Sequence, residues 1–185
     1  MPSKSHPETV ATGGKHAEVG SERFPIRCFS ARDEFERWRN ALAELYAEAY
    51  RDLREYAYRQ RPQILSYLDW LYRGDPELFL VAWNRAGQPI GFISSHRHWM
   101  DEELGDVGNI HEMAVHPHYR GLGVGRALFQ RTLERLAQEH DTVILWVGEK
   151  NIRAKAMYER RGFEEIGRHG KWIKMKRSFS RISSG

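Results

Sequence analysis

The sequence contains little cysteine and no long hydrophobic run. Its single cysteine, Cys28, excludes an internal disulfide framework and a cysteine-rich zinc site in this chain of 185 residues. No stretch approaches the roughly 18 consecutive apolar residues that a membrane-spanning helix needs. Residues 1–23 also lack the apolar core of a signal peptide. We therefore expect a cytoplasmic protein with no membrane partner.

A strong excess of one charge is also missing. The 29 Lys and Arg residues against 25 Asp and Glu residues give a net charge of +4 with His neutral. Dedicated nucleic-acid binders carry a much denser basic charge, so a nucleic-acid partner is not expected. Hydrophobic residues make up 41% of the chain and charged residues 29%, which predicts a folded protein. The length suits one domain with a sizeable core.

Composition divides the chain into three parts. Residues 1–23 are rich in Ser, Thr, Gly and His without periodicity, which predicts a flexible leader. Residues 24–177 alternate between helical and strand periodicity and form the predicted domain. Residues 178–185 trail off in serine and glycine, which predicts a flexible tail.

Hydrophobic spacing within the domain predicts a mixed α/β fold. Strands are predicted at residues 24–29, 78–83, 90–98, 107–115 and 142–147, with shorter ones near Glu165 and at 172–175. Helices are predicted from Asp33 along an apolar stripe to Tyr56, and at 64–74, 123–140 and 151–161. This order indicates hairpins and one strand–helix–strand crossover.

The segment Arg120-Gly121-Leu122-Gly123-Val124-Gly125-Arg126 joins a predicted strand to a predicted helix. Glycines at alternate positions allow a tight turn and a close approach of the backbone to a ligand. The helix that follows directs unpaired N–H groups and its positive dipole end toward the turn, which suits a phosphate or pyrophosphate. A P-loop is excluded because Arg126-Ala127 follows Gly125, and a dinucleotide fingerprint is excluded by the glycine spacing. The alternative is a tight turn without a ligand.

A second segment, Asn151 to Phe163, places Asn151, Ala154 and Tyr158 on one helical face. The small residue between two polar ones leaves room for a ligand along the helix. Gly162 then ends the helix. The alternative is that Tyr158 is a core tyrosine with a satisfied hydroxyl.

Together with Met113-Ala114-Val115-His116-Pro117, these segments resemble the GNAT superfamily of acetyl-CoA-dependent N-acetyltransferases over roughly Leu78 to Met175. The resemblance implies a single domain with a splayed central sheet flanked by helices. It also implies acetyl-CoA as cosubstrate, with its pantetheine along the strand that ends at Val115, its pyrophosphate on the glycine loop and its sulfur near Tyr158. The expected cofactor-binding residues are Met113, Ala114, Val115, Arg120, Gly121, Leu122, Gly123, Val124, Gly125, Arg126, Asn151, Ala154, Lys155 and Tyr158. Arg153 is a further candidate for the phosphates.

The family reaction is direct attack of a neutral amine on the thioester. N–H groups near Met113 to Val115 are candidates for polarising the thioester carbonyl. Tyr158 is the candidate acid for the departing thiolate. A phenol with a pKa of about 10 is a weaker acid than a thiol near about 8.5. Tyr158 therefore either has a lowered pKa or mainly hydrogen-bonds the sulfur.

Glu112 is the first candidate for the general base and Glu149 the second, with a water chain left open. His111 alternates with Glu112, so only one of the two is expected to face the cleft. The acidic loop with Asp101, Glu102, Glu103 and Asp106 either attracts a cationic acceptor or is simply solvated.

A metal site is not expected. His96 and His98 share one strand face, but no third ligand is evident beside them. Cys28 is interpreted as a core residue, which argues against a covalent acetyl-cysteine route.

The sequence thus predicts an N-acetyltransferase that acts on a primary amine of a small molecule. A non-catalytic acyl-CoA sensor and a protein or peptide N-acetyltransferase stay open as alternatives, as does a homodimer. Aromatic residues that are candidates for lining the acceptor pocket are Trp38, Tyr46, Tyr50, Tyr67, Trp70 and Trp99.

Overall fold

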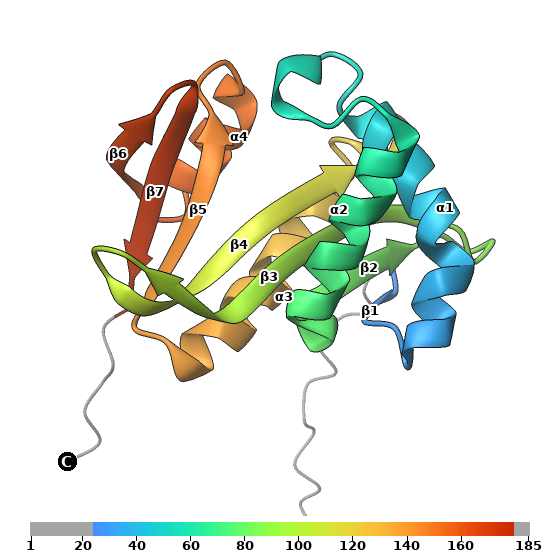
Figure 1. Cartoon of the computed structure of the whole chain (residues 1–185), viewed down its shortest axis with the longest axis horizontal. Coiled ribbons are helices and arrows are strands. Elements are labelled where there is room, and N and C mark those ends of the chain that lie inside the picture. The colour runs from blue at the N-terminus through green and yellow to red at the C-terminus, as the bar shows by residue number, and fades with distance from the viewer. Residues whose placement is uncertain (1–23, 180–185) are drawn as a thin grey trace, which may run out of the picture.

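The computed structural model describes residues 24–179 (Figure 1). The predicted leader, and the predicted tail from residue 180 on, lie outside this range. The strands are β1 (Ile26–Arg27), β2 (Phe79–Trp83), β3 (Pro89–Asp101), β4 (Gly105–Val115), β5 (Thr142–Gly148), β6 (Glu164–His169) and β7 (Trp172–Ser178). The helices are α1 (Arg32–Ala49), α2 (Arg61–Gly74), α3 (Val124–Glu139) and α4 (Ile152–Glu159). Within residues 24–179, none of these helices combines the length and apolarity needed to cross a bilayer.

All strands form one seven-stranded sheet in the order β1-β2-β3-β4-β5-β7-β6. Neighbouring strands are antiparallel except β4 and β5, which are parallel. That parallel pairing lasts for only three residue pairs, from Gly108↔Val143 to Ile110↔Leu145. Beyond it the two strands diverge and the sheet opens as a wedge (Figure 1). The mixed, splayed sheet expected from the resemblance is therefore confirmed.

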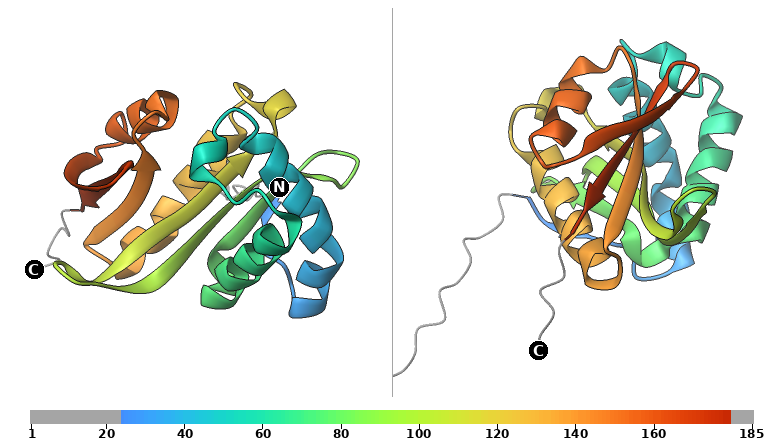
Figure 2. Two further views of the ribbon diagram at one scale, coloured as in Figure 1. Left: turned by 45° about the horizontal axis from the view of Figure 1, so that its top comes forward. Right: turned by 90° about the vertical axis from the view of Figure 1, so that its left-hand side faces the viewer.

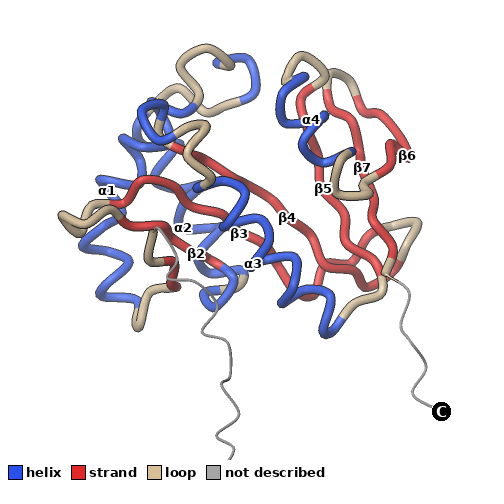
Figure 3. Tube along the Cα trace, turned by 180° about the vertical axis from the view of Figure 1, so that it is seen from behind, coloured by secondary structure: helices blue, strands red, loops and turns tan. Residues whose placement is uncertain are grey.

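Helices cover both faces of the sheet (Figures 1 and 3). Helix α3 packs its apolar stripe, including Leu128, Phe129 and Leu133, on one face. Helices α1 and α2 cover the other face, where an aromatic group around Phe35 and Phe79 forms a second core. The two cores hold β4 in place between them, so the strand edge released at the wedge is rigidly positioned.

The predicted extension of α1 to Tyr56 is wrong. The helix ends at Ala49, and the chain crosses toward α2 through a 3-10 turn at Arg54–Tyr56 (Figure 2). The Tyr56 ring lies over Gly148, where a Cβ atom would come within 2.5 Å of it, and packs edge-on against Trp172. This contact with β5 and β7 outweighs the helical periodicity and holds the α1–α2 connection across the open end of the wedge.

Candidate active site

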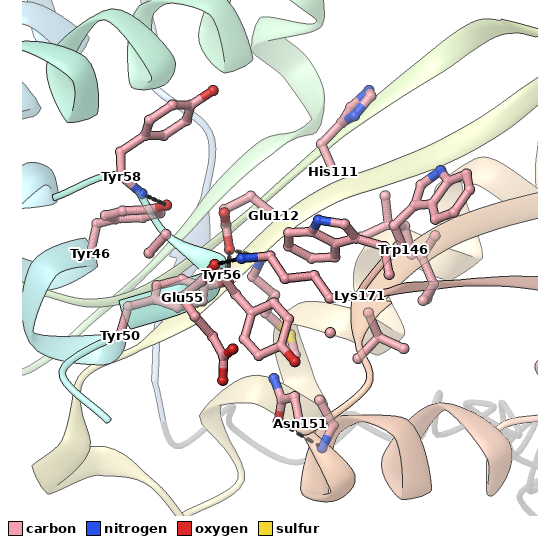
Figure 4. Close-up of a pocket in the computed structure, with 18 of the residues that line it drawn as sticks. Tyr46, Tyr50, Glu55, Tyr56, Tyr58, His111, Glu112, Trp146, Asn151 and Lys171 are labelled. Carbon is pink, nitrogen blue, oxygen red and sulfur yellow. Dashed lines mark hydrogen bonds between the residues drawn. The ribbon is translucent and has the colours of Figure 1, made fainter. Parts of the chain in front are cut away.

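Two adjoining cavities lie in the wedge between β4 and α4. The first, here called the loop cavity, has a volume of about 930 Å³ and is lined by the glycine loop and by residues 150–154 and Arg160. The second, here called the tyrosine cavity, has a volume of about 410 Å³ and is lined by Tyr46, Tyr50, Glu112 and Tyr158 among others (Figure 4). Tyr50, Met113, Asn151 and Ala154 line both cavities, so the two cavities are direct neighbours.

The glycine loop presents backbone donors to the loop cavity. Gly121 and Gly123 have φ angles of 77° and 93°, which only glycine adopts without strain. Gly123 caps α3 in this left-handed conformation, and no side chain among residues 24–179 hydrogen-bonds to the helix start. The first bond of the helix runs from the Ala127 N–H to the Gly123 carbonyl at 2.9 Å. The N–H groups of Val124, Gly125 and Arg126 therefore precede the hydrogen-bonded part of the helix, as an anion site requires.

Arginines surround these donors. Those that line the loop cavity are Arg120, Arg126, Arg153, Arg160 and Arg161. Burial lowers the pKa of Arg161, and repulsion by Arg160 and Arg126 lowers it further. The cavity thus has an excess of positive charge that a bound anion would relieve. Together with the glycine geometry, this shows that the residues fit a diphosphate.

Arg160 and Arg161 line the loop cavity but were not predicted from the sequence, whereas Lys155 was predicted to lie there. The Lys155 ammonium is instead 2.5 Å from Glu159 and 3.6 Å from Glu165, and Lys155 lines neither cavity. The missed arginines follow α4 at the point where its last turn returns to the loop cavity. Their only sequence signal is their spacing from Arg153 along the helix.

The edge of β4 that β5 releases carries further N–H groups. The His116 N–H donates to the Ile90 carbonyl at 3.0 Å, so by the alternation of an antiparallel pair the N–H groups of Met113 and Val115 face the other edge. The Met113 N–H donates to the Glu112 carboxylate at 3.0 Å. The predicted carbonyl-polarising donor and the predicted base are therefore in contact.

Glu112 is the buried acid of the tyrosine cavity. Its side chain comes from β4, and the hydroxyl of Tyr50, which follows α1, donates to it at 2.6 Å. Burial raises the pKa of Glu112 to about 7, although hydrogen bonds from Tyr50, Met113 and Tyr67 favour the ionised form. A carboxyl group that is partly ionised at neutral pH is well suited to accept a proton.

Tyr158 projects from α4 into the same cavity and is 8% exposed. Its ring packs against Phe129 and Phe163, with centroids 5.3 and 6.1 Å away. Burial raises the pKa of Tyr158, and the nearby Glu112 charge adds to the effect. Of the two roles left open by the sequence, this favours a neutral hydroxyl that donates a hydrogen bond.

The expectation that only one of His111 and Glu112 faces the cleft is wrong. Ser94 pairs with Glu112 and Ser95 with Ile110, which leaves His111 as the extra residue of a β-bulge. Both side chains consequently line the tyrosine cavity. Burial lowers the pKa of His111 to about 3, so its imidazole is neutral. Glu149, the second candidate base, is exposed and lines neither cavity.

Comparison with known proteins agrees with this geometry. Residues 37–163, more than half of the chain, match the model of the acetyltransferase (GNAT) family. The chain belongs to the GNAT acetyltransferase family.

Relatives of this GNAT chain cover different shares of it. An uncharacterized N-acetyltransferase of Methanocaldococcus jannaschii is 35% identical over 71% of this chain and 59% of its own length. A mycothiol acetyltransferase of Salinispora tropica is 37% identical over 49% of this chain and 30% of its own. The chain thus spans only part of these relatives.

Solved structures share the fold of this GNAT chain. PH1933 from Pyrococcus horikoshii superposes with a TM-score of 0.77 at 32% identity, covering 85% of this chain and 99% of that one. The NatC complex bound to Gag peptide and CoA gives a TM-score of 0.70 at 20% identity, with coverages of 85% and 99%.

Only some of the aromatic residues predicted to line the acceptor pocket of this GNAT chain line the tyrosine cavity. Of the six predicted acceptor-lining aromatics, Tyr46, Tyr50 and Tyr67 line the tyrosine cavity, whereas Trp38, Trp70 and Trp99 do not. Sequence reasoning missed the wall contributed by the α1–α2 connection, β5 and β7, namely Tyr56, Tyr58, Trp146 and Trp172.

The acidic loop lies outside both cavities, where its carboxylates contact Lys174 and His98. Asp101 and Glu103 contact the Lys174 ammonium at 2.8 and 3.5 Å, which ties the β3–β4 hairpin to β7. The Asp106 carboxylate lies 3.0 Å from His98. None of these acids lines either cavity, and Asp101 is paired with Lys174 in a mostly buried contact rather than simply solvated.

Proposed function

We propose that this protein transfers the acetyl group of acetyl-CoA to the primary amine of a small molecule by direct attack. The observation that carries the proposal is the placement of Glu112, a buried carboxyl group with a pKa of about 7, in a cavity that adjoins the loop cavity. Each cavity supplies what one of two substrates needs, and the shared wall brings the two reacting groups together.

The loop cavity residues would hold the cosubstrate, which supplies the thioester. The N–H groups of Val124, Gly125 and Arg126 bind the diphosphate, with Arg120, Arg153, Arg160 and Arg161 nearby. The released β4 edge lies along the cavity and offers the Met113 and Val115 N–H groups to the pantetheine and the thioester carbonyl. The Met113 N–H, which donates to the Glu112 carboxylate in the structure, would donate to this carbonyl instead when the cosubstrate is bound.

Residues of the tyrosine cavity would accept the proton of the attacking amine and stabilise the departing sulfur. Glu112 accepts a proton from the amine, directly or through a water molecule. Tyr50 donates to the same carboxylate and favours its ionised form. Tyr158, in the same cavity, donates a hydrogen bond to the sulfur as negative charge develops there.

The shape of the tyrosine cavity supports a small acceptor. A volume of about 410 Å³ falls in the range of small-molecule sites, about 300–1,000 Å³. Its aromatic walls around one buried carboxylate suit an amine on an apolar or slender stem. One observation favours the alternative peptide acceptor: Tyr58 and Trp146 are 48% and 39% exposed, so part of the wall continues to the surface.

A thiol-release assay with acetyl-CoA distinguishes these candidates. Small amines, polyamines, aminoglycosides and peptides with free N-termini serve as acceptors, and the Glu112→Gln variant is run beside the wild type. We expect release with at least one small amine and its loss in the variant. Turnover with peptides only would move the assignment to the peptide class. Calorimetric binding of coenzyme A without turnover of any acceptor would favour the sensor, and no binding at all would overturn the proposal.

A further inference from the structure

Two histidines and a carboxylate meet at the end of the β3–β4 ladder, away from both cavities. His98 lies on β3, Asp106 on β4, and His140 directly after α3. Each offers one ligand atom, and these atoms all lie within 4.8 Å of one another. None of the three residues lines the loop cavity or the tyrosine cavity.

The spacing of the donors suits a single ion. The His98 Nδ1 atom is 3.0 Å from the Asp106 Oδ2 atom. Ligands on a tetrahedral zinc ion are separated by roughly 3.3 Å, because Zn–N and Zn–O bonds are about 2.0–2.1 Å. The ligand atom of His140 lies within 4.8 Å of the other two, so binding one ion requires the side chains to move closer together.

His140 provides the independent observation. It is only 7% exposed, and its Nε2 atom has no hydrogen-bond partner among residues 24–179. A buried imidazole with an unsatisfied nitrogen is costly, which calls for a role beyond packing. His98 and Asp106 have side chains that are 63% and 47% exposed, so an ion can reach the group from solvent.

A further carboxylate, Glu139, lies beside His98 but on the other side of its ring from Asp106. The Glu139 Oε2 atom is 3.8 Å from the His98 Nε2 atom, while Oε1 lies 3.5 Å from Arg97. Glu139 therefore lies on the Nε2 side of the His98 ring, whereas Asp106 contacts Nδ1, and it is not a ligand of the same ion. Arg97 itself is neutralised further by Asp75 at 2.8 Å and Glu77 at 2.6 Å.

We propose that His98, Asp106 and His140 bind a zinc ion, with water in the fourth position. Two imidazole donors favour zinc over magnesium or calcium, which prefer all-oxygen sites. The sequence paired His98 with His96, but His96 packs into a ring cluster with Trp70, Trp99 and His111 instead. The ion would fasten the β3–β4 hairpin to the C-terminal end of α3.

Titration of the full-length chain with ZnCl₂ tests the site. After chelator treatment, we expect calorimetry to show an equivalent of zinc that His98→Gln and Asp106→Asn each weaken at least tenfold. His169→Gln, which removes an exposed histidine of β6, is the matched control and should leave this equivalent unchanged. Zinc should also raise the thermal midpoint of the wild type and of His169→Gln, but not of His98→Gln.

The outcomes separate cleanly. Equal zinc affinity in the wild type and in both site variants, or equal losses in all three variants, would overturn the proposal. Because the substituted side chains are exposed, loss of folding is not the expected cause of a weaker site, and unfolding curves without zinc check this. Acetyl transfer should be unaffected by either variant, so the result does not depend on the proposed function.

Discussion

The two cavities of the wedge are built by different means. The loop cavity takes its central donors from one short stretch, residues 121–126, and uses backbone N–H groups held by glycine conformations. The tyrosine cavity takes its side chains from α1, α2, β4, β5, α4, β7 and the α1–α2 connection. Its key contact joins Tyr50 to Glu112 across 62 positions of the chain.

In the proposed function, this difference means that the two substrates are recognised by different kinds of groups. A diphosphate is recognised by generic backbone geometry, which a local sequence motif can encode. An acceptor amine is recognised by side chains that only the folded chain brings together. We therefore expect substitutions in the two cavities to affect different kinetic constants, and the following experiments test that separation.

The largest effect is expected for Glu112→Gln. Loss of the base should lower kcat/KM for the amine by about 10²–10⁴ while leaving the dissociation constant of coenzyme A nearly unchanged. In the wild type, kcat/KM should rise with pH through about 7, the pKa of Glu112, and the variant should lose this rise. Glu149→Gln is the matched control, because Glu149 is exposed outside both cavities. A variant with full activity would remove Glu112 from the mechanism.

The same variant should be more stable than the wild type at high pH. The folded-state pKa of Glu112 lies above its ordinary 4.5, so its contribution to stability is full below about pH 4.5 and is lost as pH rises through about 7. The loss is on the order of 3 kcal/mol at ~1.4 kcal/mol per pKa unit. Thermal unfolding should show that the gain of Glu112→Gln grows between pH 5 and pH 8. A gain independent of pH would contradict this interpretation.

Tyr158→Phe should have the next largest effect. A hydrogen bond to a charged group contributes about 1.5–3 kcal/mol, so kcat should fall roughly 10- to 150-fold. Coenzyme A affinity, measured by calorimetry, should fall much less than kcat, because the sulfur that Tyr158 faces gains its negative charge only during transfer. Unchanged turnover would mean that the sulfur leaves without this hydroxyl.

Gly123→Ala should weaken the loop cavity alone. With φ at 93°, an alanine at this position is strained, and the turn before α3 should shift. We expect coenzyme A affinity to fall about tenfold, corresponding to roughly 1.4 kcal/mol, with little change in amine KM. Gly87→Ala introduces similar strain at φ 73° in the remote β2–β3 turn and should leave coenzyme A affinity unchanged. Equal effects of both variants would indicate a general loss of stability.

Tyr50→Phe should have the smallest effect. Without its hydroxyl, the ionised form of Glu112 loses a donor, so the pKa of Glu112 should rise and the pH–rate curve should move to higher pH. At pH 7 this lowers the rate by a few-fold. Tyr46→Phe is the matched control, because the Tyr46 hydroxyl accepts from the Tyr58 N–H instead. Identical shifts in both variants would assign the effect to packing.

The same contrast explains what could be predicted from the sequence. The mixed α/β order and the glycine loop were predictable because helical periodicity and glycine spacing are local. The end of α1 was not, because the Tyr56–Gly148 contact that interrupts the helix joins distant segments. The bulge at His111 was also not predictable, since strict alternation is the default expectation for a strand.

Candidate residues followed the same rule. Glu112 could be proposed as the base from its strand, but the tyrosines that hydrogen-bond to it could only be suggested as general aromatic lining. Lys155 carried a charge suited to phosphate, yet its position on α4 directs it to Glu159. The proximity of His98 to His140 was not predicted because His140 lies 42 positions further along the chain.

The ring of Tyr56 occupies the space where any side chain at position 148 would stand. The Tyr56 wall of the tyrosine cavity can keep its position only if residue 148 has no side chain. Substitutions that alter the cavity should therefore leave Gly148 unchanged. Variants with altered acceptor specificity should accordingly be sought by substituting Tyr46, Tyr58 and Tyr67 while Tyr56 and Gly148 are kept.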